Sequence, residues 1–511
     1  VWGEQLSEYI PQNFSYLPME IVRDENGEEV IINIAFPGRT VYAKAWRVPV
    51  GRISLYLLDT DIDQNSPEDR GITGKLYGGD SEMRIKQEMF LGIGGIRLMD
   101  RINIKPTIYH CNEGHAAFCG LERLSVYITR HNLDFDVAKE LVRTSTLFTT
   151  HTPVPAGHDV FEEHLMRTYL SHYPGRMNIS WDDFMNLGKI RHNDPYEKFS
   201  MSVLATNLSQ EVNGVSKIHG RVSREMFQQM WPGYFAEENH IGYVTNGVHL
   251  PTWADASWQK LYKEVLGENY IDVQSDLNVW SKIENVADET IWNIKKELKH
   301  KLTEYLKVKV VEDMQRRQES PSLIINTIEN FNENALIIGF ARRFATYKRA
   351  HLLFNNIERL AELLNNPEKP VVFLFAGKAH PNDKAGQDLI KMIIETSRRK
   401  EFAGKVIFLN NYDMELGKIL TSSVDIWMNT PTRPLEASGT SGEKAVMNGT
   451  LNLSVLDGWW AEGYREKAGW ALQEERTYSD QRYQDELDAE TIYNLIENEI
   501  VSLYFDRNEK G

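Results

Sequence analysis

Four basic side chains lie within eight residues of one another in a chain whose formal net charge is −16. The four are Arg342, Arg343, Lys348 and Arg349. They follow the apolar run 336–341, which has the composition of a strand buried on both faces. Guanidinium and ammonium groups at the carboxyl end of a strand suit the oxygen atoms of a phosphate. The plainer alternative is a solvated basic helix start, but the acidic background favours an anion site.

A second polar cluster, EASGTSGEKA at residues 436–445, follows another predicted strand and opens a predicted helix. Its free backbone N–H groups and hydroxyls are suited to cradle a phosphate. It is not a P-loop, because only two residues separate Gly439 from Gly442 and no Ser or Thr follows Lys444. Burial at a helix start lowers the pKa of a lysine, so Lys444 suits Schiff-base formation with an aldehyde cofactor. A tight turn with a solvent-facing lysine explains the spacing equally well.

Histidines, carboxamides and one carboxylate gather in loops of the first half of the chain. They are Asn112, Glu113, His115, His151, His158, Asn246 and His249. Their spacing matches no common zinc pattern and no HExxH sequence occurs, so we predict no metal site. Hydrogen bonding to a polyhydroxylated ligand is the better interpretation of the set. For His158 and His249, capping or otherwise satisfied loop positions are favoured.

Apolar runs separated by helical patterns predict parallel α/β sheets in both halves of the chain. Residues 1–75 are β-rich, with alternating or apolar runs at 29–35, 40–49 and 52–58. The later strands are expected at 106–109, 146–150, 241–245, 336–341, 371–376, 406–409, 424–428 and 451–456. Helical patterns cover 83–99, 250–330 and about 489–505.

The expected architecture is α/β, with two Rossmann-like domains. An N-terminal α/β domain over 1–248 and a C-terminal Rossmann-like domain over 331–511 are joined by a helical linker region over 249–330. Ligands of open parallel sheets gather beyond the carboxyl ends of the strands, where the polar clusters of both halves fall. An active site in the cleft between the two domains follows. The aromatic residues expected in the core rather than in the site are Trp459, Trp460 and Trp470.

Composition and charge exclude several classes of protein. The chain has 511 residues, 41% of them hydrophobic and 25% charged, which supports a large core. An excess of 73 acidic over 57 basic residues argues against binding to nucleic acid or to anionic membranes. Two cysteines suit a reducing, cytoplasmic compartment, and no apolar run is long enough for a bilayer. The chain starts with Val1 and carries no signal-peptide pattern, so we expect it to begin and end within a longer protein.

Six ordered segments carry the polar clusters described above. They are LYGGDSEMRIKQE (76–88), YHCNEGHAAF (109–118), FTTHTPVPAGHD (148–159), YVTNGVH (243–249), GFARRFATYKRA (339–350) and EASGTSGEKAVMNGTLNLSVLDGWWAEGY (436–464). Together they resemble the α-glucan (glycogen/maltodextrin) phosphorylase family, in particular its shorter prokaryotic branch. The resemblance implies the two-Rossmann GT-B architecture and the cofactor pyridoxal 5′-phosphate (PLP). It also implies phosphorolysis of the terminal unit of an α-1,4-glucan (glycogen or maltodextrin) to glucose 1-phosphate, with retained configuration.

The resemblance assigns one group of residues to the cofactor. Lys444 matches the lysine that holds PLP. Thr440, Ser441 and Arg342 match the surroundings of the cofactor phosphate. Tyr412 matches a tyrosine that packs near the cofactor ring. In the family mechanism the cofactor acts through its phosphate, which assists the proton transfer from substrate phosphate to the leaving oxygen.

A second group is implied for the substrates. Arg343 and Lys348 match the pair that binds substrate phosphate. The residues that match contacts to the glucosyl unit are Tyr347, Glu436, Ser438, Gly439, His151 and Asn246. The carbonyl of His151 is expected to help stabilise the transition state. The expected catalytic set is therefore Lys444, Arg343, Lys348 and His151.

The sequence also departs from the family pattern. Glu443 stands where many members carry an apolar residue. The Gly-rich loop that contacts substrate phosphate is expected before Val1, and the closing helices beyond Gly511, so the chain alone can be inactive. The alternatives are a GT-B glycosyltransferase that uses a nucleotide sugar, similar to glycogen synthase, and a catalytically silent glucan-binding fragment. A homodimer is compatible with the resemblance.

Overall fold

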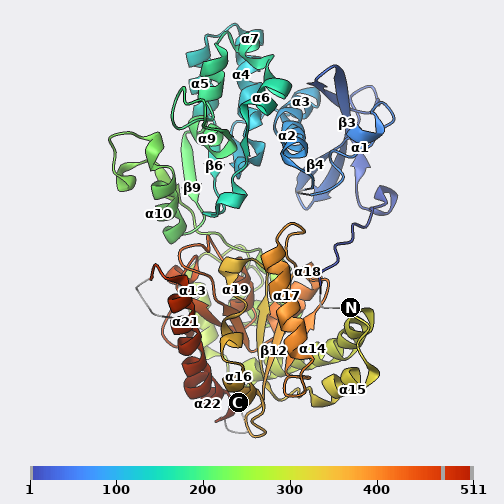
Figure 1. The fold of residues 1–511 in the computed structure, drawn as a ribbon, viewed down its shortest axis with the longest axis vertical. Helices are drawn as coiled ribbons and strands as arrows, with labels where there is room; N and C mark the ends of the chain where they lie inside the picture. The colour runs from blue at the N-terminus through green and yellow to red at the C-terminus, as the bar shows by residue number, and fades with distance from the viewer. Residues whose placement is uncertain (1–3, 77, 473–477, 507–511) are drawn as a thin grey trace. The chain divides into compact units, whose positions relative to one another are not determined.

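The computed structural model describes residues 4–76, 78–472 and 478–506, which form two compact units. One unit is Glu8–Val244, and the other is formed by the described residues from Thr245 onward with those up to Ser7. Each unit contains a parallel sheet with helices packed against it (Figure 1). Tyr77 of the first motif, and both ends of the chain, lie outside the described residues.

The Glu8–Val244 unit begins with an antiparallel sheet, as the β-rich pattern of its sequence predicts. Its strands are β1 (Glu20–Ile21), β2 (Ile31–Phe36), β3 (Arg39–Val50) and β4 (Ile53–Asp59), with β3 paired to the other three. Side chains of β2 alternate between core and solvent, so that Ile32, Ile34 and Phe36 are buried. They pack on the π-helical turn Phe90–Gly94, which lies between α2 (Ser81–Met89) and α3 (Gly95–Arg101).

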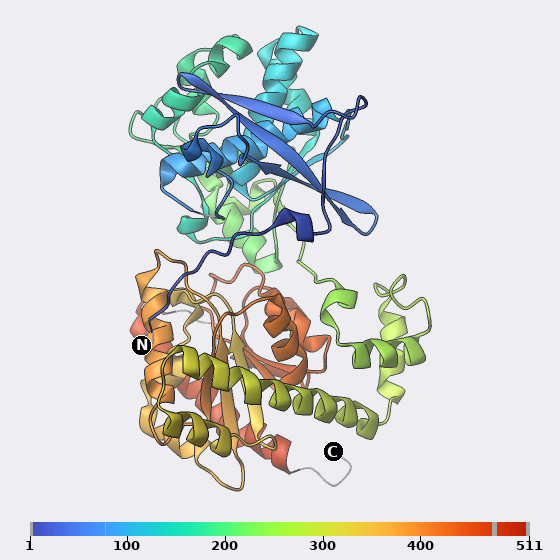
Figure 2. The same ribbon diagram turned by 90° about the vertical axis from the view of Figure 1, so that its right-hand side faces the viewer.

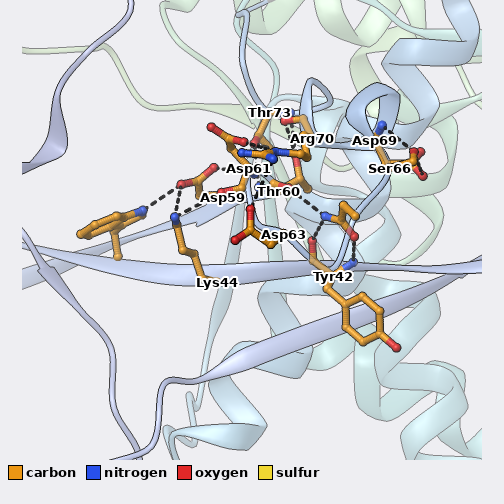
Figure 3. Close-up of polar contacts among 12 residues, drawn as sticks. Tyr42, Lys44, Asp59, Thr60, Asp61, Asp63, Ser66, Asp69, Arg70 and Thr73 are labelled. Carbon is orange, nitrogen blue, oxygen red and sulfur yellow. Dashed lines mark hydrogen bonds and ion pairs between the residues drawn. The ribbon is translucent and has the colours of Figure 1, made fainter.

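The loop that follows β4 is held by a network of polar contacts (Figure 3). Asp59 forms an ion pair with Lys44 at 3.4 Å. Arg70 pairs with Asp61 at 2.5 Å and with Asp63 at 3.3 Å. Each of these three carboxylates is therefore paired with a cation, Asp59 with Lys44 and the other two with Arg70.

Asp69, in the short helix α1 (Pro67–Arg70), gives this unit a pH-dependent stability. Its buried carboxylate accepts two hydrogen bonds from Arg39, at 2.7 and 2.8 Å, and one from Ser66. The hydrogen bonds from Arg39 lower the pKa of Asp69. Because the folded-state pKa is the lower one, this stabilisation is present above the unfolded-state pKa of about 4 and is lost as pH falls through the folded-state value.

We expect Asp69→Asn to lower the free energy of unfolding by about 1–3 kcal/mol at neutral pH, because an amide cannot accept both hydrogen bonds of Arg39. Thermal denaturation of both proteins from neutral to acidic pH measures the difference. The difference in free energy of unfolding between the two proteins should become smaller as acid protonates the wild-type carboxylate. A difference that stays constant down to the most acidic pH at which the protein folds would contradict the role of the ionised Asp69 carboxylate.

The same unit continues as a four-stranded parallel sheet in the order β10-β9-β6-β5. The strands are β5 (Tyr109–Asn112), β6 (Thr146–Thr149), β9 (Glu211–Gly214) and β10 (Ile241–Tyr243), and a short antiparallel pair is formed by β7 (Val160–Phe161) and β8 (Phe199–Ser200). The predicted strand 106–109 is misplaced, because pairing begins where Tyr109 N–H donates to Ser145 O at 2.8 Å and Pro106 has no N–H. The helices are α4 (Phe118–His131), α5 (Phe135–Thr144), α6 (Glu163–Leu170), α7 (Tyr173–Met177), α8 (Trp181–Asn186), α9 (Met201–Asn207) and α10 (Lys217–Met226).

The second unit is built on a six-stranded parallel sheet in the order β13-β12-β11-β14-β15-β16. Its strands are β11 (Leu336–Ala341), β12 (Val371–Ala376), β13 (Val406–Leu409), β14 (Ile426–Asn429), β15 (Leu451–Val455) and β16 (Gly469–Leu472). Every residue of β11 and β12 is buried, as their unbroken apolar runs predict. The predicted strand 424–428 starts too early, because Val424 is the C-cap of the preceding helix. The four residues of β16 are too few to give a sequence pattern.

Helices cover both faces of this sheet. The helices of this unit are α11 (Leu250–Trp253), α12 (Ala256–Leu266), α13 (Leu277–Trp280), α14 (Asp288–Arg316), α15 (Pro321–Asn330), α16 (Ile357–Leu364), α17 (Lys384–Ser397), α18 (Met414–Ser423), α19 (Thr440–Val446), α20 (Trp460–Gly463), α21 (Gln481–Leu495) and α22 (Val501–Phe505). Of these, α11, α12 and α13 pack in a separate apolar cluster with Leu298 of α14. The long α14 crosses one face (Figure 2) and buries Leu302, Leu306 and Val310 in the core there. Residues 249–330, the predicted linker, thus pack within this unit.

The helix expected over about 489–505 begins earlier, at Gln481. Asp480 caps it by accepting N–H bonds from Arg482 and Tyr483, and its polar first turns carry little apolar periodicity. A π-helical turn, Ile496–Ile500, joins α21 to α22. In the part of the chain that the structure describes, no helix is both long and apolar enough to cross a membrane.

Candidate active site

The strand order of the second unit reverses between β11 and β14, and the predicted phosphate-binding residues follow these two strands. Arg342 and Lys348 come after β11, and Glu436 lies in the loop after β14. The Glu436 Oε2 atom accepts hydrogen bonds from Arg342 Nη2 at 2.8 Å and from Lys348 Nζ at 2.5 Å. All three residues are buried. Ligands of open parallel sheets bind beyond the carboxyl ends of strands at such a reversal, so we take this cluster as the centre of the site.

Burial gives the three charged groups unusual properties. Burial and the positive charge of Arg342 lower the pKa of Lys348 to about 7. Burial also raises the pKa of Glu436, but the charges of Arg342 and Lys348 lower it by more, so this carboxylate stays ionised. Lys348 therefore gains or loses its proton near neutral pH, and a second anion beside it would favour the protonated form.

Several buried polar atoms of this region have no hydrogen-bond partner among the described residues. They are Nε and Nη1 of Arg342, Oγ of Ser438, Oε2 of Glu443 and the Oδ1 atoms of Asn429 and Asn452. Buried polar atoms of folded proteins are nearly always paired. Two unpaired nitrogens on one buried guanidinium fit an anion with several oxygen atoms, such as a phosphate group. The residues present therefore fit a cofactor that carries a phosphate.

Lys444 lies on α19 with its ammonium nitrogen 3.6 Å from the ring centre of Trp253. Burial lowers the pKa of Lys444, and the neighbouring Glu443 opposes this effect. A lowered pKa increases the neutral amine, which is the form that reacts with an aldehyde. The sequence analysis did not include Trp253, the last residue of α11, in the site. Its position four residues after the segment 243–249 is the only feature of the sequence that could have indicated it.

The start of α19 requires glycine at two positions, the N-cap Gly439 and Gly442 within the helix. Gly439 has φ +81°, in the left-handed region. A Cβ on Gly442 would lie 2.7 Å from Asn452 Oδ1 and 2.9 Å from Trp459 Nε1. Trp459, expected in the core, is thus half-buried beside the start of this helix, whereas Trp460 is buried as expected.

The residues predicted around the cofactor ring and phosphate follow two strands of the same sheet, β13 and β14. Thr440 and Ser441 form the first turn of α19, and Ser441 Oγ accepts a hydrogen bond from Trp427 Nε1 at 3.1 Å. Tyr412 is half-buried in the loop that follows β13. Burial raises the pKa of Tyr412, so its hydroxyl keeps its proton at neutral pH.

Other predicted substrate residues are more accessible. Tyr347 is half-buried, and Lys348 Nζ lies 4.6 Å from the centre of its ring. Arg343 is exposed, so it is not part of the buried cluster. Asn246 is half-buried in the loop between β10 and α11.

In the Glu8–Val244 unit, Glu113 holds the backbone of His151. Its Oε2 accepts the His151 N–H at 2.7 Å, and its Oε1 accepts the Gly114 N–H at 3.2 Å. Glu113 has φ +64° and ψ 171°, a region in which residues other than glycine are strained. The exposed ring of His151 lies with Nε2 3.3 Å from Asn112 Oδ1. The buried carboxylate of Glu113 therefore fixes the position of the His151 peptide. The sequence analysis grouped these two residues but did not predict this contact between them.

We expect Glu113→Ala to lower kcat/KM for the reaction proposed below roughly 10- to 100-fold. The reason is that the His151 N–H loses a hydrogen bond to a charged acceptor, which contributes about 1.5–3 kcal/mol. Steady-state kinetics with the folded variant measures the loss. Glu113→Gln is the intermediate variant, since its single side-chain oxygen can accept only one of the N–H groups of His151 and Gly114, and it should lose less activity than Glu113→Ala. An unchanged activity in Glu113→Ala would contradict the role of this carboxylate.

The remaining histidines of the predicted set have structural partners. His158 contacts Ser202 Oγ and Thr152 O, each at 2.8 Å, and His249 contacts Thr252 Oγ1 at 2.7 Å. Both side chains are therefore hydrogen-bonded within the protein, as the sequence analysis favoured for these two positions.

His115 belongs to an ionic group with Glu88 and Asp159, whose ligand atoms are spaced closely enough for a metal ion. The guanidinium of Arg84 contacts all three, at 3.2, 3.1 and 2.7 Å. A metal ion here would have to displace a cation of the chain, so the arrangement favours an ion-pair network.

Comparison with known proteins agrees with this arrangement. Residues 67–469 match the carbohydrate phosphorylase family. The chain is 42% identical to the maltodextrin phosphorylase of Thermococcus litoralis, over 99% of this chain and 60% of that protein. It is 39% identical to the glycogen phosphorylase of Mycobacterium tuberculosis strain H37Rv, over 97% and 58% respectively. It is 37% identical to the glycogen phosphorylase of Aquifex aeolicus, over 100% and 72%.

The chain therefore belongs to the carbohydrate phosphorylase family, as the six sequence segments indicate. It spans about 60% of the length of the Thermococcus litoralis and Mycobacterium tuberculosis relatives.

Proposed function

We propose that this protein is an α-1,4-glucan phosphorylase that releases glucose 1-phosphate from glycogen or maltodextrin. The observation that carries the proposal is the buried cluster of Arg342, Lys348 and Glu436, with two unpaired guanidinium nitrogens. Such a cluster suits phosphate, and the lysine of lowered pKa on α19 suits an aldehyde cofactor. Relatives named maltodextrin and glycogen phosphorylase support the same activity.

PLP is the proposed cofactor, held by Lys444 with Thr440, Ser441 and Arg342 near its phosphate and Tyr412 near its ring. When bound, PLP supplies a phosphate group that exchanges a proton with the substrate phosphate. Trp253 covers the lysine and limits the access of water to it. The unpaired nitrogens of Arg342 are the donors available to the cofactor phosphate.

The substrate phosphate is bound, in this proposal, by Lys348 and Arg343. Lys348 donates a hydrogen bond to the ionised Glu436, and a bound phosphate dianion would raise the pKa of Lys348 above about 7, so that the lysine is protonated when phosphate is bound. The positive charges fix the phosphate below the sugar, where its negative charge stabilises an oxocarbenium-like transition state.

The glucosyl unit is bound by Glu436, Ser438, Gly439, Tyr347, His151 and Asn246. These residues offer carboxylate, hydroxyl, backbone N–H and amide groups, which suit the hydroxyl groups of a sugar. We also propose the GT-B architecture, with one Rossmann-like domain in each unit. Its support is that the polar residues of each unit follow the carboxyl ends of a parallel sheet.

The test incubates the chain with PLP, maltoheptaose and inorganic phosphate. We expect release of glucose 1-phosphate, and borohydride reduction should leave a pyridoxyl group on Lys444. A glycosyltransferase would instead release nucleotide from a nucleotide-activated glucose without PLP, and a silent fragment would bind maltoheptaose without turnover. Either result, or the lack of an adduct on Lys444, would overturn the proposal for this chain.

A further inference from the structure

Asp457 follows β15 at the same edge of the sheet as the Glu436 cluster and is 3% exposed. Its Oδ2 accepts the N–H of Glu436, and its Oδ1 accepts the N–H of Gly458, each at 2.9 Å. Burial raises the pKa of Asp457 to about 7, and the hydrogen bonds from the backbone N–H groups of Glu436 and Gly458 oppose this effect by favouring the carboxylate. Asp457 therefore ties the loop after β14 to the turn after β15.

The turn Asp457–Trp459 holds the neighbouring loop at a second point. The N–H of Trp459 donates to Ser438 O at 2.8 Å. Gly458 has φ +54°, and a Cβ added there would lie 2.3 Å from Ser438 O and 3.2 Å from Glu436 O. The two backbones are so close that a side chain at position 458 would push them apart.

We propose that Asp457 is a positioning residue for the sugar, acting through the backbone of the loop Glu436–Gly439. The inference rests on the proposed function, in which this loop contacts the glucosyl unit. Arg342 and Lys348 come from the segment after β11, and Lys444 comes from α19. Displacing this loop therefore acts on its contacts to the sugar and, through the carboxylate of Glu436, on the ion pairs with Arg342 and Lys348.

The test is Asp457→Asn, studied in the PLP-loaded protein. An asparagine presents one acceptor oxygen and one NH₂ group, so one of the two N–H groups loses its acceptor and meets a donor. We expect the KM for maltoheptaose to rise roughly tenfold or more and kcat to change less than about threefold. The KM for phosphate should rise by less than that for maltoheptaose, through the contact of Glu436 with Lys348. The pyridoxyl absorbance should match that of the wild type.

Asp425→Asn is the matched control. Asp425 also accepts a backbone N–H, that of Ile337 at 2.8 Å, but it does so at the amino end of the sheet, where it is paired with Lys299 at 2.7 Å as well. This variant should lower the melting temperature without changing the KM for maltoheptaose. If Asp457→Asn behaves in the same way, its role is only structural and the inference is wrong.

Gly458→Ala is a second variant on the same turn, and it decides the matter if Asp457→Asn does not fold. A raised KM for maltoheptaose supports the inference, and an unchanged KM overturns it. Calorimetric titration with maltoheptaose measures the same contact without turnover. If the wild type binds maltoheptaose but releases no glucose 1-phosphate, the proposed function fails while this titration still tests the role of Asp457.

Discussion

Lys444→Ala is expected to remove the pyridoxyl adduct and to lower the proposed phosphorolysis roughly a thousandfold or more, because the amine proposed to hold the cofactor is lost. The structural basis is the position of Lys444 on α19, where burial lowers its pKa and Trp253 covers its ammonium group. Mass spectrometry after borohydride reduction measures the adduct, and a coupled assay measures glucose 1-phosphate.

Lys444→Arg separates the loss of the cofactor from a loss of stability. A guanidinium keeps the positive charge over the Trp253 ring, an interaction worth about 0.5–2 kcal/mol, but it does not condense with an aldehyde. We therefore expect a melting temperature near that of the wild type and no adduct. Full activity in Lys444→Arg would show that the cofactor is not held through this residue.

Much of the fold could be predicted from the sequence because the strands of the second unit are continuous apolar runs. Leu336–Ala341 and Val371–Ala376 are buried along their whole length, and such runs have few alternatives. Boundaries were less certain where a single residue decides them, as Pro106 does before β5 and Asp480 does before α21. The sequence also did not predict that the described residues up to Ser7 belong to the second unit. They do so because Gln5 forms hydrogen bonds with the backbone of Ala379, 374 residues away.

The candidate site was predictable where its residues are close in sequence. Arg342 and Lys348 lie in one segment, and Lys444 shares a second with Glu436, so each segment could be recognised on its own. The residues that were missed act through contacts between distant segments. Trp253 of α11, for example, contacts Lys444 of α19 although the two residues are far apart in the sequence. Such pairings follow from tertiary packing and leave no periodic signal in one sequence.

Lys348→Ala is expected to weaken phosphate binding roughly 10- to 100-fold and glucan binding less than about threefold, because the lost partner of the ligand is a cation. The same substitution leaves Glu436 paired with Arg342 alone. Arg343→Ala should act in the same direction, with a smaller effect because Arg343 is exposed. Titration with phosphate and with maltoheptaose measures both affinities. Equal weakening of both ligands would contradict the assigned role.

The pH dependence gives a sharper test of Lys348, because its pKa lies at about 7. Sulfate is a suitable probe, since it stays a dianion across the range in which the lysine titrates. Below its pKa Lys348 is protonated and attracts sulfate, and above it the charge is lost, so the dissociation constant of the wild type should rise up to about tenfold per pH unit. Lys348→Arg keeps its charge and should bind sulfate equally well across this range, whereas Lys348→Ala should bind weakly at every pH. A wild-type pH profile that is as flat as that of Lys348→Arg would show that another group, and not this lysine, controls the binding of the anion.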